Sequence, residues 1–405
     1  MDEPPSGARR PARGIVVAGL GIGQILAWGS TYYLPAVLAP TIAADLGVPL
    51  APIVGGLTVG LVAASLVSPR VGRAIEATGG RTVLAFASLT MAAGLGALAF
   101  AQGLVTYLAA WLVIGIGMGA GLYDAAFSTL GKLYGREARA AITNLTLFGG
   151  FASTVCWPLS AFLVETLGWR GTCLAYAAIH VCVTAPIHLR LVPRLPPPAP
   201  PPPAPANAGG AAGADATAPS AAPPHPLLPL ALATGLTIGA IASATMSVHV
   251  ISLLQERGTS LAAAVALAAL IGPAQVGARV IEAVIGRRFH PILTAAASTL
   301  LTLAGIGVLA LGLPVLALGL VLYGAGIGIR SIVRGTLPLA LFGQHGYAAL
   351  MGRLALPQLL VGALAPLGAA FVIDWAGGDV LLAILVALCL LDLAFVALIA
   401  ALMRR

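Results

Sequence analysis

Residues 117–130, GMGAGLYDAAFSTL, and residues 324–337, GAGIGIRSIVRGTL, are two versions of one pattern. In both, three glycines at alternate positions are followed by Thr-Leu, and each matching pair, such as Gly117 and Gly324, is 207 residues apart. The first copy carries one acid, Asp124, and the second carries two bases, Arg330 and Arg334, all within long apolar runs. A duplicated chain with charges in equivalent apolar helices predicts a membrane transporter whose site lies between its two halves.

The composition excludes a water-soluble protein. Of 405 residues, 59% are hydrophobic and 8% are charged, and the mean hydropathy is +0.99; soluble domains are roughly 25% charged. The net charge of +8 does not indicate nucleic-acid binding, because the basic residues occupy short loops between apolar runs. The cysteines all lie in apolar segments and their spacing predicts neither a metal site nor a disulfide framework: Cys156, Cys173, Cys182 and Cys389.

Twelve apolar runs have the length of about 20 residues that a transmembrane helix needs. They are 14–38, 52–71, 82–101, 104–130, 140–166, 171–190, 227–253, 260–286, 291–312, 314–341, 347–373 and 380–402. The predicted fold is all-α, with two six-helix bundles at residues 1–190 and 227–405. Residues 191–226 are rich in Pro and Ala, cannot bury apolar surface, and predict a disordered linker.

The distribution of Lys and Arg predicts the orientation in the membrane. If the N-terminus is cytoplasmic, fifteen basic residues lie at cytoplasmic ends and loops, whereas Arg170 and Arg257 alone lie outside. Four more, Arg279, Arg330, Arg334 and Arg353, lie within helices. We therefore expect both termini and the linker to be cytoplasmic.

A glycine-and-charge pattern follows the second predicted helix. Gly72 precedes Glu76 by four residues, Gly79 follows three later, and Arg73 and Arg81 supply positive charge. Such an acid can cap a neighbouring helix and pair with an arginine, which would lock one gating state. A second copy, Gly277, Arg279 and Glu282, repeats the Arg–Glu spacing of three in the other half. Arg279 is either part of this gate or the binding residue of an anionic substrate.

The pattern at 72–81 resembles the loop signature of the major facilitator superfamily, with Glu76 in place of the usual Asp and Ala77 in place of a base. Gly168-Trp169-Arg170 is also common in that family. Residues 142–147 and 151–158, together with Trp28-Gly29-Ser30-Thr31-Tyr32-Tyr33, resemble a bacterial subgroup that includes arsenite-efflux permeases. This resemblance implies a bacterial inner-membrane protein.

In that family helices 1, 4, 7 and 10 line the cavity. The resemblance therefore implies a substrate or proton pathway made of Gln24, Trp28, Tyr32, Asp124, His249, Arg330 and Arg334, and the same helices also offer Tyr33 and Tyr123. Tyr32 and Tyr33 are alternatively aromatic residues of the membrane interface. An unpaired charge within a membrane is costly, so we expect Asp124 either to be protonated or to have a cationic partner, with Arg330 and Arg334 as the candidates. Such a pair is a proton or substrate site, a structural bridge between the bundles, or both.

The predicted function is secondary transport of a small solute by alternating access, without a cofactor, because no nucleotide-binding loop is present. We expect proton-coupled efflux of a toxic solute such as a metalloid; the alternative is a carrier of monocarboxylates or other small organic anions. An enzyme is not expected, because no paired acids, metal-spaced histidines or nucleophile–base arrangement occur. A sensor that has lost transport would be expected to lose its intramembrane charges. The expected partners are the solute and membrane lipid, and we expect a monomer.

Overall fold

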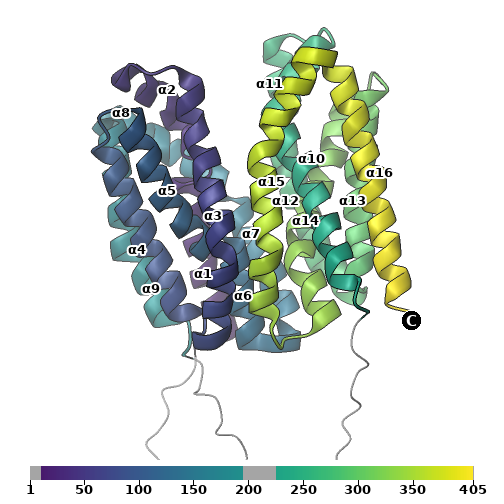
Figure 1. The fold of residues 1–405 in the computed structure, drawn as a ribbon, viewed down its shortest axis with the longest axis horizontal. Coiled ribbons are helices and arrows are strands. Elements are labelled where there is room, and N and C mark those ends of the chain that lie inside the picture. The colour runs from purple at the N-terminus through teal and green to yellow at the C-terminus, as the bar shows by residue number, and fades with distance from the viewer. Residues whose placement is uncertain (1–10, 195–224, 405) are drawn as a thin grey trace, which may run out of the picture.

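The computed structural model describes residues 11–194 and 225–404, and every regular element in this part of the chain is helical. The N-terminal half contains α1 (Arg13–Ser30), α2 (Pro35–Leu46), α3 (Leu50–Thr78), α4 (Gly80–Ala99), α5 (Leu104–Gly121), α6 (Tyr123–Tyr134), α7 (Ala138–Gly150), α8 (Ala152–Ile179) and α9 (Ala185–Leu191). The C-terminal half contains α10 (Leu228–Glu256), α11 (Leu261–Ala268), α12 (Ile271–Ile285), α13 (Pro291–Ala310), α14 (Leu316–Phe342), α15 (Tyr347–Ala376) and α16 (Gly378–Leu402). The two bundles stand side by side (Figure 1), which confirms the predicted all-α fold.

Eleven helical segments of the described chain are long and apolar enough to cross a membrane. One of them, Ala138–Leu191, has 54 residues, or about 80 Å of helix at 1.5 Å per residue, against a hydrocarbon core of about 30 Å. Gly168 interrupts it with φ 69° and ψ 174°, a backbone conformation that suits glycine. The turn at Gly168 therefore divides this segment into two crossings, which correspond to the predicted helices 140–166 and 171–190.

Several helix limits differ from the prediction because apolar composition alone does not mark breaks in a helix. The first predicted helix, 14–38, is α1 and α2, and the run 104–130 is broken at Leu122, whose backbone is extended. The pattern predicted as a loop at 72–81 lies mostly inside α3, which continues to Thr78. Most of the predicted linker, 195–224, lies outside the described residues.

Both ends of the described chain lie on one face of the molecule, which we call the terminal face: α1 and α10 begin there, and α9 and α16 end there (Figure 1). Within the described residues, the polar contacts between the two halves lie in the half of the molecule nearer this face. Four hydrogen-bonded contacts among these residues join the halves: Glu76 with Ala348, Asp124 with Arg334, Arg139 with the end of α12, and Arg279 with Thr146. The halves are therefore joined at the terminal face.

Two arginines occupy equivalent places on the opposite face. Arg170 forms an ion pair with Asp45 and donates to the carbonyl of Ala101, just beyond α4. Arg257 forms an ion pair with Asp379 and donates to the carbonyl of Ala310, at the end of α13. In each half, one arginine thus caps the C-terminal end of the third membrane helix.

Candidate functional site

Asp124 and Arg334 form an ion pair across the two halves. Arg334 Nε donates to Asp124 Oδ1 at 2.8 Å, and Nη2 donates to Oδ2, so the carboxylate is held in a bidentate manner. Asp124 lies in the first turn of α6, directly after the break at Leu122, where the positive end of the helix dipole favours an acid. The structure thus pairs Asp124 with one of its two predicted partners.

The break before α6 also positions the predicted pathway residues of α1. Gln24 Nε2 donates to the carbonyl of Gly121 at 2.8 Å, and its Oε1 accepts from Trp28 Nε1 at 3.2 Å. The Trp28 ring lies 5.1 Å from the ring of Tyr123 and 5.2 Å from that of Tyr32. The structure therefore brings Gln24, Trp28 and Tyr32 together around the start of α6.

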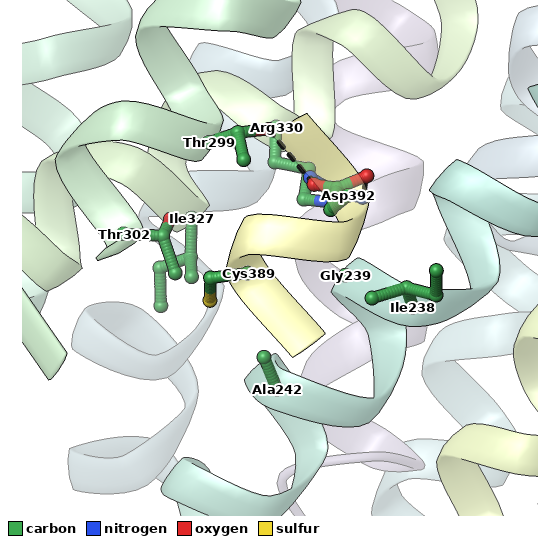
Figure 2. Close-up of a pocket in the computed structure, with 9 residues that line it drawn as sticks. All are labelled: Ile238, Gly239, Ala242, Thr299, Thr302, Ile327, Arg330, Cys389 and Asp392. Atoms are coloured by element: carbon green, nitrogen blue, oxygen red, sulfur yellow. Dashed lines mark hydrogen bonds and ion pairs between the residues drawn. The ribbon is translucent and has the colours of Figure 1, made fainter. Parts of the chain in front are cut away.

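Arg330 lies elsewhere, although the sequence placed it beside Arg334. Its guanidinium binds Asp392 of α16, with Nη1 at 2.7 Å from Oδ2, and donates to the carbonyl of Gly235. Asp392 Oδ2 also accepts from the Thr299 hydroxyl at 2.8 Å. Arg330 and Asp392 are among the residues that line a small cavity of about 10 Å³ (Figure 2), enough for about one water molecule. Because all these residues belong to the C-terminal half, the pairing of Arg330 with Asp124 that the sequence left open is wrong.

Arg279 is the buried cation that lacks an acid among the described residues. It is 6% exposed, and its side chain donates to the carbonyls of Gly328 and Thr146 and to Gln275 Oε1, at 3.2, 3.2 and 3.3 Å. Gly328 lies near the middle of α14, so the guanidinium sits at mid-depth. It is therefore a positive charge bound by neutral oxygens at the junction of the two halves.

Two consecutive glycines on α7 allow this approach. A Cβ atom at Gly150 would lie 2.6 Å from Arg279 Nη1, and one at Gly149 would lie 1.9 Å from the Tyr123 hydroxyl. Because Gly149 and Gly150 are adjacent, the Tyr123 hydroxyl and the Arg279 guanidinium pack against neighbouring positions of α7. The aromatic residues around α6 and the free cation thus belong to one region, which the sequence had treated as separate features.

The first gating pattern lies where α3 crosses α15. Glu76 accepts from Lys132 Nζ at 2.6 Å and from the backbone N–H of Ala348, in the first turn of α15, at 3.1 Å. It therefore caps a helix, as the pattern predicted, but its ion-pair partner is a lysine rather than an arginine. Gly72 packs directly on α15, since its Cβ would lie 2.4 Å from the Ala348 carbonyl oxygen.

The second pattern contacts the N-terminal half through Arg139. This arginine donates to the carbonyls of Gly286 and Phe289, at the end of α12, and lies 3.8 Å from Glu282. Glu282 also accepts from Thr294 at 2.9 Å. Arg279 and Glu282 therefore have different partners, although their spacing puts them on one helix face.

The other predicted residues contribute less to these contacts. Arg73 is exposed, Arg81 is half-buried near the start of α4, and Gly79 forms the turn between α3 and α4 with φ 81°. His249 donates to the carbonyl of Pro366 at 2.9 Å, within the C-terminal half. The structure thus does not bring His249 to the region around Arg279 and Tyr123 by any hydrogen bond of the described residues.

The comparisons with known proteins agree with this architecture. A family model described as Major Facilitator Superfamily matches residues 20–352, and no curated protein matches the chain. Among solved structures, the human organic anion transporter MFSD10 (TETRAN) is 19% identical, with a TM-score of 0.70 and coverage of 96% of this chain and 100% of that one. FucP in the outward conformation (15%, 0.67, 94% and 98%) and the proton:xylose symporter XylE (11%, 0.69, 95% and 94%) are also similar.

At these identities the solved structures show a common fold, and the family match covers most of the chain. With eleven apolar helical segments, the protein is an integral membrane protein and a transporter rather than an enzyme. The chain belongs to the major facilitator superfamily.

Proposed function

We propose that the protein carries a small organic anion across the membrane by alternating access, with Arg279 as the positive charge that binds it. The observation that carries this proposal is the burial of Arg279 at mid-depth without a carboxylate among the described residues. Arg330 and Arg334 each have an aspartate, and Arg353 is exposed. Arg279 is therefore the intramembrane arginine that a substrate carboxylate would neutralise.

The energetics favour an anionic ligand over a neutral one. Removing an ion from water costs several kcal/mol even after local relaxation, and neutral carbonyl oxygens offset only part of that. A bound carboxylate would supply both an opposite charge and a planar, bidentate acceptor for the guanidinium. Of the two classes that the sequence left open, organic anion and metalloid, the geometry supports the anion.

The cysteines do not favour the metalloid class. Cys156 and Cys173 are buried and Cys182 is exposed, and the described residues contain no group of three His, Cys, Asp or Glu side chains that could hold a metal ion. The resemblance to arsenite-efflux permeases stays a prediction. Arsenite therefore belongs in the same flux assay as the anions, as the rival substrate.

Alternating access would change the surroundings of Arg279 directly. Its Nη1 donates to α7 of one half while its Nε donates to α14 of the other. Separation of the halves at the terminal face would break the first bond and expose the cation to solvent. We propose that this state releases or receives the anion.

Coupling to protons is a further part of the proposal. Opening the terminal face would also separate Asp124 from Arg334, and an acid that loses its cation binds a proton more readily. We propose proton-coupled export from a bacterial cytoplasm, with the terminal face on the cytoplasmic side. The fifteen basic residues that the sequence analysis assigns to cytoplasmic ends and loops support this orientation.

The test is flux into proteoliposomes with radiolabelled lactate, pyruvate, benzoate, xylose and arsenite. We expect saturable flux of one or more carboxylates, and a loss of at least about 30-fold in Arg279→Gln, because breaking a buried charge pair costs about 2–5 kcal/mol and 1.4 kcal/mol corresponds to tenfold. Arg279→Met should retain or raise the unfolding temperature, since a buried charge disappears. Saturable flux of xylose or arsenite alone, unchanged in Arg279→Gln, would refute the proposal.

Gln275→Glu is the sharper variant. It places a carboxylate where Gln275 Oε1 already lies 3.3 Å from Arg279 Nη2. The new carboxylate should form an ion pair with Arg279 within the protein, and so abolish anion flux without loss of stability. Gln102→Glu, at an exposed position on the opposite face, is the matched control. Normal anion flux in Gln275→Glu would contradict the role of Arg279.

A further inference from the structure

A groove between α1 and α7 opens near the terminal face, with a cavity of about 370 Å³. Its lining consists of Arg13, Gly14, Val17, Ala18, Asn144, Leu147 and Phe148. We propose that this groove binds an anionic phospholipid from the leaflet at the terminal face. Lipid binding in this groove would be independent of the solute that the protein carries.

The groove faces the bilayer rather than the other half. On α7, contacts to the C-terminal half are made at Arg139, Ile142, Thr146 and Gly150, which recur at helical spacing. Asn144 follows Ile142 by two positions and therefore lies about 200° around the helix from it. Asn144 is exposed, so the groove side of α7 is turned away from the C-terminal half and toward lipid.

The groove exists because α1 carries small residues where α7 passes. Gly14 has no atom within 4 Å of the position of a Cβ, and Ala18 lies one turn further along the groove. Deeper in the contact, Gly21 lets the Phe148 ring pack directly on α1, with a would-be Cβ 2.3 Å from the ring. The apolar part of the groove, formed by Val17, Leu147 and Phe148, offers an apolar surface against which an acyl chain can pack.

Two polar side chains, those of Arg13 and Asn144, line the groove beside its apolar residues. Arg13 lies 5.8 Å from the centre of the Tyr134 ring and pairs at 3.3 Å with Glu137, which is 79% exposed. Such an exposed pair is weak, so the guanidinium can bind a lipid phosphate in addition or instead. The side-chain amide of Asn144 makes no hydrogen bond to any described residue, and Asn144 lies six residues into α7, about 9 Å along the helix.

These positions follow the order of groups in a phospholipid. The phosphate would meet Arg13 at the terminal end, the glycerol ester oxygens would meet the Asn144 amide, and one acyl chain would fill the groove. An uncovered amide on a lipid-facing helix is costly unless a polar group covers it. An anionic headgroup is favoured over a zwitterionic one because basic residues at a membrane surface attract anionic lipid.

The test uses the purified full-length protein and native mass spectrometry with phosphatidylglycerol and phosphatidylcholine of identical acyl chains. We expect the wild type to retain phosphatidylglycerol about fivefold more tightly, the equivalent of ~1 kcal/mol per basic residue at 1.4 kcal/mol per tenfold. Arg13→Gln should remove this preference and leave acyl-chain binding. Asn144→Leu should weaken the binding of both lipids.

Gly14→Leu should fill the groove and remove the retained lipid, since nothing obstructs a side chain there. Gly96→Leu is its matched control, because Gly96 of α4 also has no atom within 4 Å of a Cβ, and it should bind lipid as the wild type does. Thermal unfolding of each variant checks that the fold is intact. Equal retention of both lipids by the wild type, or unchanged retention in Gly14→Leu, would overturn the proposal.

Discussion

At the residue scale, two arginines lie one turn apart on α14, and each forms an ion pair with a different aspartate. One of these aspartates belongs to the N-terminal half and the other to the C-terminal half. Arg334 binds Asp124 of the N-terminal half, and Arg330 binds Asp392 of its own half. The repeat in the sequence reduced the candidate partners of Asp124 to Arg330 and Arg334, and the structure selects Arg334. The repeat did not predict Asp392, because a contact between α14 and α16 depends on packing that the repeat does not encode.

A signal for Asp392 was nevertheless present. It is the single charged residue of the apolar run 380–402, and Asp124 can neutralise only one of the two arginines on α14. Balancing charges among the intramembrane segments would have indicated a second acid. The same balance does not identify Arg279 as unpaired, because Glu282 lies three residues away in the same run. That Glu282 binds Arg139 and Thr294 instead is set by packing that the sequence does not show.

The Asp124–Arg334 pair should couple stability to transport. In Asp124→Asn, the Arg334 guanidinium loses its counter-charge, and we expect a loss of about 3–5 kcal/mol in stability together with reduced flux. The double variant Asp124→Asn/Arg334→Gln should recover most of the stability but not the flux. Thermal unfolding and proteoliposome flux of the same preparations measure both effects.

Arg330 cannot replace Arg334 in these variants, because it is bound to Asp392. The double variant Arg330→Met/Asp392→Leu, which removes a pair within one half, is therefore the matched control and should reduce flux less. If the two double variants lose flux equally, the position of the Asp124–Arg334 pair between the halves is not what matters.

At the element scale, the crossing of α3 and α15 depends on two glycines that face each other. A Cβ at Gly72 would lie 2.4 Å from the Ala348 carbonyl oxygen, and one at Gly352 would lie 2.4 Å from the Ser68 carbonyl oxygen. Glu76 caps α15 one turn away from this contact. The sequence pattern predicted a gate here, but it could not show that the glycines set the distance between the helices.

Gly72→Ala should push α3 and α15 apart at the terminal face. Overpacking of this kind costs about 1–3 kcal/mol, so the closed state should be disfavoured and flux reduced while the protein still reaches the membrane. Gly272→Ala, at a position with no atom within 4 Å of a Cβ, is the control and should be neutral in flux assays and membrane-fraction blots. Wild-type flux in Gly72→Ala would show that close contact here is not required.

Helix breaks show where prediction from composition succeeded and failed at this scale. The turn at Gly168 was predicted, because charged and glycine residues interrupt the apolar run between 166 and 171. The break at Leu122 was not, because the run 104–130 stays apolar through it. That break frees backbone groups, and Gln24 of α1 satisfies one of them, a tertiary contact that no local pattern reports.

At the scale of the whole molecule, the duplicated sequence and the paired bundles correspond, but the two halves have diverged in charge. The N-terminal half offers an acid to the interface at Asp124, whereas the C-terminal half offers Arg334 and Arg279. The polar contacts between the described parts of the halves lie between mid-depth and the terminal face, so we expect that face to open when the opposite state forms. The orientation of this face decides whether such opening leads to the cytoplasm.

The basic residues predict that the terminal face is cytoplasmic, and labelling can test this on described positions. Position 210, a natural choice in the linker, lies outside the described residues. His345 is exposed in the turn between α14 and α15 at the terminal face, and Leu313 is exposed between α13 and α14 at the opposite face.

In a chain whose exposed Cys182 is replaced by Ala, an impermeant maleimide added to intact cells should label Leu313→Cys and spare His345→Cys. Labelling of His345→Cys should appear once the membrane is permeabilised. The reverse pattern in intact cells would invert the topology and, with it, the direction of the proposed export, because the face now inferred to receive the anion from the cytoplasm would receive it from outside.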